Sequence, residues 1–300
     1  MTYSVVARDP DTAALGVACQ SHFFAVGRAV NHAEAGAGAI ANQSLIEPAY
    51  ARLGLAALRE GATAQQALDA GLAADPLPEL RQVAIADARG GLAVHTGKRC
   101  VGAAGARAGD SWLVQGNMLA SEAVLDAMAA AMAAGGPLVD RMLAALAAAD
   151  AAGGDLRGRQ AAGIRVVAAG EPDDATDGVL LDLRVEDAPD PVAELTRLVG
   201  LARSSASVLG VLAGEGVLVG EYREPRPGAT DAALATLAAV AGEDSEAGLE
   251  AQLWHCVLLT RAGRTAESAT AARALLGRRP ELRQFLHNLA EAGYLERSPA

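Results

Sequence analysis

The sequence predicts an α+β protein with a four-layer αββα sandwich, followed by a small all-α domain. Short β-prone runs and pairs of helical runs alternate in the order strands, two helices, strands, two helices, strands, and most connections are too short for parallel crossovers. From residue 230 onward, every periodic segment has helical spacing. We therefore expect mainly antiparallel sheets covered by helix pairs, although periodicity alone also fits a less specific α+β domain.

The predicted strands fall into three groups separated by the helix pairs. The first two form a hairpin, because the Pro and Asp residues of 9–12 supply turn chemistry between them. The segment 36–43 is rich in small residues, and 81–87 is apolar on both faces, as expected for a strand buried on both sides. The predicted strands are 2–7, 15–20, 36–43, 81–87, 92–95, 111–115, 164–168 and 179–184.

The predicted helices are recognised by apolar residues that return at every fourth position. Val124, Met128 and Met132 share one helical face in this way. Pro48 suits a first helical turn, and Thr63 is a predicted N-cap. The predicted helices are 48–57, 64–72, 124–132, 138–146, 191–203, 231–241, 246–261, 266–276 and 281–292.

The domain boundary is predicted at a segment with linker composition, Arg-Glu-Pro-Arg-Pro-Gly. We expect a first domain at 1–222, a linker at 223–229 and a helical domain at 230–300. The helical domain resembles one tetratricopeptide unit with a following helix, and a single unit cannot bury its own apolar face. We expect it to pack on the main domain, on another subunit or on a partner protein. The matching residues are 253–254, 263–264, 266–267, 274–276, 280 and 289–290.

Composition narrows the class of protein. Hydrophobic residues make up 51% of the chain and charged residues 20%, which is typical of a globular protein. Uncharged runs such as 127–139 are too short for a membrane span, and the N-terminal residues lack the regions of a secretory signal, so we expect a cytoplasmic protein that does not bind membranes. The net charge of −11 argues against nucleic-acid binding, which needs a basic surface.

Metal and cofactor chemistry have no signature in the sequence. Cys19, Cys100 and Cys256 are odd in number and widely spaced, which predicts neither a disulfide framework nor a structural metal site. No segment matches a phosphate-binding loop, a dinucleotide glycine fingerprint or an HExxH zinc helix. We therefore expect no metal and no cofactor.

Thr2 is the candidate nucleophile. It follows Met1, and a side chain as small as threonine permits removal of the methionine, which would leave a free α-amine beside a hydroxyl. An α-amino group has a pKa of about 7.7–8.0, so its neutral form can take the proton from the hydroxyl while the oxygen attacks a carbonyl. The alternative is that Thr2 merely begins the first strand.

A series of short motifs follows Thr2 in a fixed order along the chain. They are 3–10, 16–18, 20–21, 23–27, 34–36, 38–39, 81–82, 87, 95–97, 115–119, 153–155, 157–160 and 182–185. Together they resemble a bacterial family, domain of unknown function number 1028, that is regarded as N-terminal-nucleophile (Ntn) hydrolase-like. The resemblance covers roughly residues 2–203 and implies the αββα sandwich. The chain departs from the family pattern at Asn42, where a threonine is common, and at Ala161, where a serine is common; both changes could remove a hydroxyl from the pocket.

The other candidate site residues each have a structural alternative. Asn117 could donate to a developing oxyanion or serve as a turn residue. His95 could orient the substrate or be a structural histidine. Gln20, Ser21 and Gln43 lie at or beyond the ends of strands expected beside Thr2, and Ser21 could assist proton transfer or be a loop hydroxyl.

A charged segment after the second helix pair supplies further candidates. Asp155, Arg157 and Arg159 alternate, so all three could point one way. An arginine fork of this kind, with Gln160 beside it, would suit an anionic group of a substrate, while the alternative is a set of structural ion pairs.

The sequence therefore predicts an amidohydrolase that cleaves a C–N bond of a small molecule through Thr2. No lysine lies in 3–97 to assist the amine, and an arginine such as Arg28 could partly replace it. The rival hypothesis is a non-catalytic ligand-binding or scaffold protein whose helical tail mediates assembly. Under either hypothesis we expect a homo-oligomer.

Overall fold

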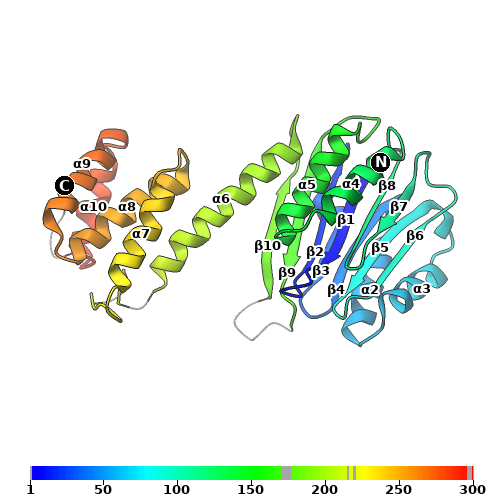
Figure 1. Cartoon of the computed structure of the whole chain (residues 1–300), viewed down its shortest axis with the longest axis horizontal. Helices are drawn as coiled ribbons and strands as arrows, with labels where there is room; N and C mark the ends of the chain where they lie inside the picture. Colours follow the sequence, from blue (N-terminus) through cyan, green and yellow to red (C-terminus); the bar gives the residue numbers. More distant parts are fainter. Residues whose placement is uncertain (1, 171–176, 215, 219–220, 296–298, 300) are drawn as a thin grey trace. The chain divides into compact units, whose positions relative to one another are not determined.

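The chain divides into two compact units, 1–197 and 198–300. The division lies inside helix α6 (Pro191–Leu212), and the segment 223–229, expected as the linker, lies within the second unit. Figure 1 shows the computed structural model. It describes residues 2–170, 177–214, 216–218, 221–295 and 299.

The larger sheet of the first unit has the strand order β10-β9-β2-β1-β8-β7, and all neighbouring strands are antiparallel. The predicted hairpin is present as β1 and β2, with Val5 opposite Ala18. On its other side β1 pairs with β8, so that Thr2 lies opposite Asn117. The strands are β1 (Thr2–Arg8), β2 (Leu15–Ser21), β7 (Gly105–Ala108), β8 (Trp112–Asn117), β9 (Ala161–Val167) and β10 (Val179–Val185).

The smaller sheet has the order β3-β4-β5-β6 and is also antiparallel. Its β5–β6 turn places Gly90 at a φ of 93°, a conformation that favours glycine. The Asp87 carboxylate closes this turn by accepting from the backbone N–H groups of Arg89 and Gly91. The strands are β3 (Asn31–Glu34), β4 (Gly38–Ser44), β5 (Arg81–Asp87) and β6 (Leu92–Thr96).

Each sheet carries a helix pair on one face, as Figure 1 shows. Helices α4 (Ala123–Ala133) and α5 (Leu138–Ala151) pack on the larger sheet, and α2 (Ala49–Arg59) and α3 (Ala64–Ala74) pack on the smaller one. The predicted cap of α3 is confirmed, because Thr63 and Gln66 form a reciprocal capping box.

Four short elements have no counterpart in the sequence-based prediction: α1 (Val26–Val30), β3, β7 and the 3-10 helix η1 (Pro78–Leu80). Each has only three to five residues, which is too short for a hydrophobic period to be recognised. Helix α1 also begins after Ala25 in the left-handed region, at a φ of 56°, where a glycine or asparagine would have been the usual signal.

The two sheets pack face to face through small and branched apolar side chains. Val6, Val17 and Leu113 from the larger sheet share one buried cluster with Ala39 and Ala84 from the smaller sheet. Alanines on β4 and β5 let the sheets approach closely, since side-chain volume sets the spacing of packed layers. Apolar side chains fill one part of this interface, and buried polar side chains fill the rest.

The second unit is helical and has its own core. It was expected to need another surface to cover its apolar face, but Val208 of α6 and Leu218 of the following turn join the buried cluster with Leu237, Val257 and Leu275. The predicted four helices therefore bury their apolar residues largely within the unit. They are α7 (Ala229–Ala241), α8 (Glu246–Arg261), α9 (Thr265–Arg278) and α10 (Leu282–Glu291).

Among the described residues, α6 is the one helix long and apolar enough to cross a membrane by length and composition. These two criteria are also met by core helices of soluble proteins. The helix carries Glu194 and Arg197 in an ion pair, and Leu195 and Val199 are buried. It therefore gives no clear signal of a membrane span.

Candidate active site

Thr2 is the first residue of β1, a central strand of the larger sheet, and only 5% of it is exposed. Its hydroxyl donates to Ser21 Oγ at 3.2 Å, and its backbone carbonyl accepts from Gln43 Nε2 at 3.0 Å. Asn117 is its cross-strand neighbour on β8. Four of the residues predicted for the site therefore come together.

Buried polar side chains fill the space between the sheets at this end of the strands. Because side chains alternate along a strand, the face that carries Val6 on β1 also carries Ser4 and Thr2. On the neighbouring strands, the side chains that point between the sheets at this end carry amide or hydroxyl groups instead of apolar groups. We call the resulting group the polar cluster; its members are Thr2, Ser4, Ser21, Gln43, Gln82, Gln115 and Asn117, all buried.

Gln82 on β5 is the centre of the polar cluster. Its Oε1 accepts from Gln43 Nε2 at 2.8 Å and from Asn117 Nδ2 at 2.9 Å, while its Nε2 lies 2.8 Å from the Gly116 carbonyl. One side chain thereby joins the strand of Asn117 to the opposite sheet. Gln82 was not predicted as a site residue, although it is a polar residue directly before the apolar run 83–86, on the same face as alanines that meet the other sheet.

Gln115 on β8 is a second member that sequence reasoning missed. Its Nε2 donates to Ser4 Oγ at 3.3 Å and to the Ala41 carbonyl of the smaller sheet at 3.1 Å. It therefore makes a second amide bridge between the sheets, two residues from Asn117. The signal available in the sequence was the spacing, since Gln115 and Asn117 share one face of their strand.

Three amide oxygens of the polar cluster accept no hydrogen bond from any residue that the structure describes. They are Oε1 of Gln43, Oε1 of Gln115 and Oδ1 of Asn117. A buried acceptor without a donor costs free energy, so such atoms are typical of positions where water or a ligand binds. The cluster therefore offers three acceptors to a bound donor.

Asp155 fixes the loops around Thr2. Its carboxylate is almost fully buried and accepts from the backbone N–H groups of His22 at 3.0 Å and Arg157 at 2.8 Å. The Arg157 guanidinium pairs with the same carboxylate at 3.3 Å and also lies 3.4 Å from Ser21 Oγ. The Ser21 hydroxyl thus lies between the positively charged Arg157 guanidinium and the Thr2 hydroxyl.

Arg159 and Gln160 lie apart from this arrangement. Arg159 pairs with Asp150 at 2.7 Å and with Asp190 at 3.3 Å, and Gln160 donates to Asp187 at 3.1 Å. Arg157 and Arg159 therefore bind separate carboxylates, and the structure does not join them in a fork. Both arginines are partly exposed.

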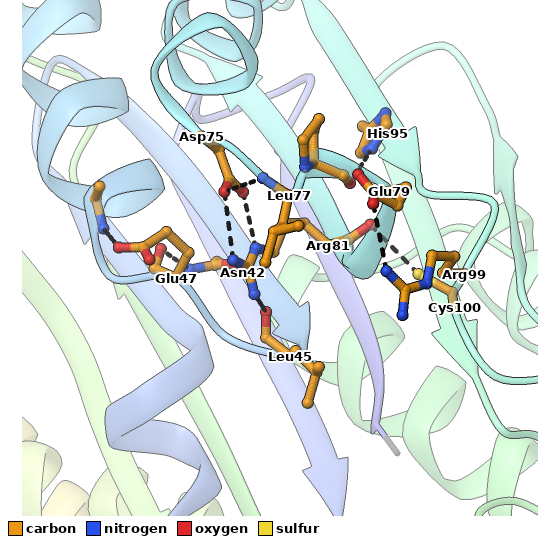
Figure 2. A network of polar contacts seen from close by, with 12 residues as sticks. Asn42, Leu45, Glu47, Asp75, Leu77, Glu79, Arg81, His95, Arg99 and Cys100 are labelled. Atoms are coloured by element: carbon orange, nitrogen blue, oxygen red, sulfur yellow. Dashed lines mark hydrogen bonds and ion pairs between the residues drawn. The ribbon is translucent and has the colours of Figure 1, made fainter.

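His95 lies on β6 outside the polar cluster. Figure 2 shows it beside the chain near Glu79, where its Nε2 is 2.8 Å from the Pro78 carbonyl oxygen. In the same network Arg81 is held between the Asp75 carboxylate and the Leu45 carbonyl. These contacts connect the loop after β4 with the segment before β5. Their role is therefore to hold the fold together.

Gln20 faces away from Thr2, because its neighbours Cys19 and Ser21 point between the sheets. It lies opposite Tyr3 on the helix-covered face, and neither polar atom of its amide has a hydrogen-bond partner among the residues that the structure describes. Burial and the nearby Asp150 carboxylate raise the pKa of Tyr3, so its hydroxyl is neutral.

The two departures from the family pattern lie in different surroundings. Asn42 donates to the Glu47 carbonyl at 2.7 Å, on the face of β4 away from Gln43 (Figure 2). Ala161 lies opposite Ser21 and is buried between the sheets. Only the second departure therefore changes the surroundings of the polar cluster.

Exposed apolar side chains follow the site residues along the chain. Phe23 and Phe24 come directly after the Ser21-His22 pair, and Leu156 follows Asp155. Leu156 is 70% exposed and both phenylalanines are at least half exposed. Because Asp155 is bonded to the backbone of His22, these three residues lie on neighbouring loops, which we call the apolar rim.

The family model "Family of unknown function (DUF1028)" matches residues 2–195, and the chain therefore belongs to this family. Its structure is similar to the crystal structure of a protein from Silicibacter pomeroyi assigned to the same family. The two chains are 28% identical with a TM-score of 0.60, and the match covers 71% of this chain and 90% of the other. A search of curated proteins finds no significant match.

Proposed function

We propose that the first unit is a four-layer αββα sandwich of the Ntn-hydrolase type and that the protein is an amidohydrolase acting on a C–N bond of a small molecule. The observation that carries the proposal is the position of Thr2. It begins a central strand, its hydroxyl is hydrogen-bonded to Ser21, and it belongs to a buried polar cluster built from both sheets. The packing order of helix pair, sheet, sheet and helix pair supports the fold assignment.

The proposed reaction requires removal of Met1, because a peptide nitrogen cannot act as a base. Thr2 Oγ1 then attacks the carbonyl carbon of the substrate while the hydroxyl proton passes to the α-amine of the same residue. The tetrahedral intermediate collapses, the C–N bond breaks, and the proton moves from the amine to the leaving nitrogen. Water hydrolyses the resulting ester, which releases a carboxylic acid and restores Thr2.

Asn117 is the proposed oxyanion donor. Its Nδ2 carries two hydrogens and donates one to Gln82, so the second can bind a developing negative charge. Gln43 has a different role, because its Nε2 donates to both the Thr2 carbonyl and Gln82. Gln43 is therefore a positioning residue that fixes the backbone of the nucleophile.

Arg157 is the proposed cation beside Thr2, in the role expected from the sequence for a lysine or for Arg28. Its guanidinium reaches Ser21 Oγ, which in turn accepts the Thr2 hydroxyl. A cation at this distance stabilises the negative charge that builds up on the Thr2 oxygen. Arg28 lies on α1 and lines a separate cavity.

The apolar rim suggests the kind of substrate. Phe23, Phe24 and Leu156 are exposed beside the loops that Asp155 holds. A ligand with an apolar group next to its amide would cover these side chains. Its binding would be favoured, since burial of apolar area contributes roughly 25 cal/mol per Å². We propose an apolar acyl or amine portion for this reason.

The test is an intact-mass measurement of the full-length protein before and after incubation with a β-lactone. We expect a mass short by one methionine and a single adduct that maps to Thr2. Thr2→Ala should form no adduct, whereas Thr2→Ser should still react. A retained Met1, or a processed N-terminus that never reacts, would overturn the nucleophile and favour the ligand-binding or scaffold function.

We further propose that the protein acts in the cytoplasm as a homo-oligomer and that the second unit serves assembly. The tetratricopeptide-like segment corresponds to α8 and α9, which pack against each other and are joined by a turn with Gly263 at a φ of 71°. Leu209, Phe285 and Tyr294 remain exposed on this unit and offer apolar contact area. Sedimentation velocity with Phe285→Ser against the wild type tests the assembly role.

A further inference from the structure

A second site lies at the edge of the first unit, apart from the polar cluster. It is a cavity of about 220 Å³ between α1, β3 and the strand pair β9 and β10. The strands β10 and β9 lie at one edge of the larger sheet, and β3 is one of the two edge strands of the smaller sheet. The cavity shares no residue with the polar cluster.

Arginines give the cavity its charge. Arg28, Arg165 and Arg184 line it together with Asp182. Arg165 pairs with Asp182 and donates its Nε to the Ala33 carbonyl at 3.1 Å, which fixes its guanidinium. Arg28 has no carboxylate partner among the residues that the structure describes, so the wall keeps a net positive charge.

Arg184 and His32 also line the cavity, and they differ in charge. The nearest carboxylate oxygen to Arg184 is that of Glu186 at 3.6 Å, which is longer than a hydrogen bond. Burial and the neighbouring Arg165 lower the pKa of His32, so this residue is neutral at pH 7. The positive charge therefore comes from the arginines.

Gly27 lines this cavity and packs closely against Gly163 of β9. A Cβ atom at Gly27 would lie 3.0 Å from Arg184 Cγ, and one at Gly163 would lie 2.9 Å from Gly27 Cα. Helix α1 can therefore rest on β9, and the aliphatic stem of Arg184 passes over the contact. A side chain at Gly27 would press on the aliphatic part of Arg184, and one at Gly163 would press on the backbone of α1.

Asn31 supplies a neutral polar group to the same cavity. The residue is only 8% exposed, and its side chain makes no hydrogen bond to an oxygen or nitrogen atom of the residues that the structure describes. Its hydrogen-bond neighbour is the buried Cys19 thiol. A thiol is a weak hydrogen-bonding group, so the Asn31 amide keeps hydrogen-bonding capacity that a bound ligand would satisfy.

We propose that this cavity binds a small anionic molecule through a carboxylate or phosphate group held by Arg28, Arg165 and Arg184, with the Asn31 amide as a further contact. Guanidinium groups match the geometry of both anions. A volume of about 220 Å³ lies below the range of drug-sized pockets and suits a compact anion.

The experiment is isothermal titration of the full-length protein with inorganic phosphate and, separately, with succinate, at constant ionic strength so that screening does not vary. We expect saturable binding of at least one of these two anions. Arg28→Gln and Arg184→Gln should each weaken it at least about tenfold, as expected for a lost charged hydrogen bond. Arg28 is exposed, so its replacement should leave the fold intact.

The matched control is Arg107→Gln. Arg107 lies on β7 at the opposite edge of the same sheet and pairs with Asp126 at 2.8 Å. Its replacement should leave anion affinity unchanged. Absence of saturable binding to both anions would overturn the proposal, and so would an equal loss in Arg107→Gln. If Arg28→Gln changed the sedimentation coefficient but not anion affinity, the site would instead hold a carboxylate of a second copy, which also overturns it.

Discussion

Gln43 and Gln82 join the two sheets through a hydrogen bond of 2.8 Å between buried side-chain amides. The same Gln82 oxygen accepts from Asn117, and Gln43 also holds the Thr2 carbonyl. The backbone of the proposed nucleophile is thus fixed by a side chain of the opposite sheet. A change at Gln82 should therefore affect both stability and the placement of Thr2.

Gln82→Leu should lower the free energy of unfolding by about 2–3 kcal/mol, because it leaves the donors of Gln43 and Asn117 without their acceptor in a buried place. Urea unfolding followed by circular dichroism measures the change. Gln65→Leu is the control, since Gln65 is exposed on α3 and bonds only to Asp69 among the described residues. Equal effects of the two substitutions would contradict a special role for Gln82.

Arg157→Gln should slow the reaction of Thr2 with a β-lactone by about tenfold without abolishing it, because it removes the positive charge one hydroxyl away from the nucleophile. The rate of adduct formation in the mass spectrum is the readout. Arg159→Gln removes an arginine that pairs with Asp150 and Asp190 instead, so it should react at the wild-type rate. A similar loss in both variants would show that Arg157 acts only through the fold.

Asp75→Asn should destabilise the protein by about 3 kcal/mol at pH 7, because it leaves the buried Arg81 guanidinium without its carboxylate. Hydrogen bonds from Arg81 hold the pKa of Asp75 below its ordinary value. A lowered pKa stabilises the fold above the unfolded value of about 3.9, and this contribution is lost as the pH falls through the folded value.

The difference between wild type and Asp75→Asn should therefore shrink below about pH 4. Urea unfolding at a series of pH values measures it. Glu194→Gln, which breaks the exposed Glu194–Arg197 pair, should show little effect at any pH. A difference for Asp75→Asn that persists undiminished at pH 3 would contradict the assignment.

Gly163→Ala should cost about 1–3 kcal/mol of stability and weaken anion binding, because its Cβ would lie 2.9 Å from the Gly27 backbone and force α1 away from β9. Thermal unfolding and phosphate titration are the measurements. Gly102→Ala is the control, since a Cβ there meets no atom within 4 Å. A Gly163→Ala protein with unchanged stability would show that the contact between α1 and β9 is loose.

The sequence by itself determined most of the secondary structure. The hairpin of β1 and β2 and the two helix pairs follow from apolar periodicity and capping residues, which are local properties. The motifs also identified the family, and they placed Thr2, Gln43 and Asn117 among the site candidates. Short elements such as α1 were not predicted, because they contain too few residues to show a hydrophobic period.

Tertiary structure decided which polar residues meet. The pairing of β1 with β8 and the packing of the sheets are contacts between distant parts of the chain, so only they bring Gln82 and Gln115 to Thr2. The same long-range packing placed His95 on the Pro78 carbonyl and separated Arg157 from Arg159. Local sequence gives the face on which a side chain lies, but the opposing surface is set by the order of strands and the stacking of layers.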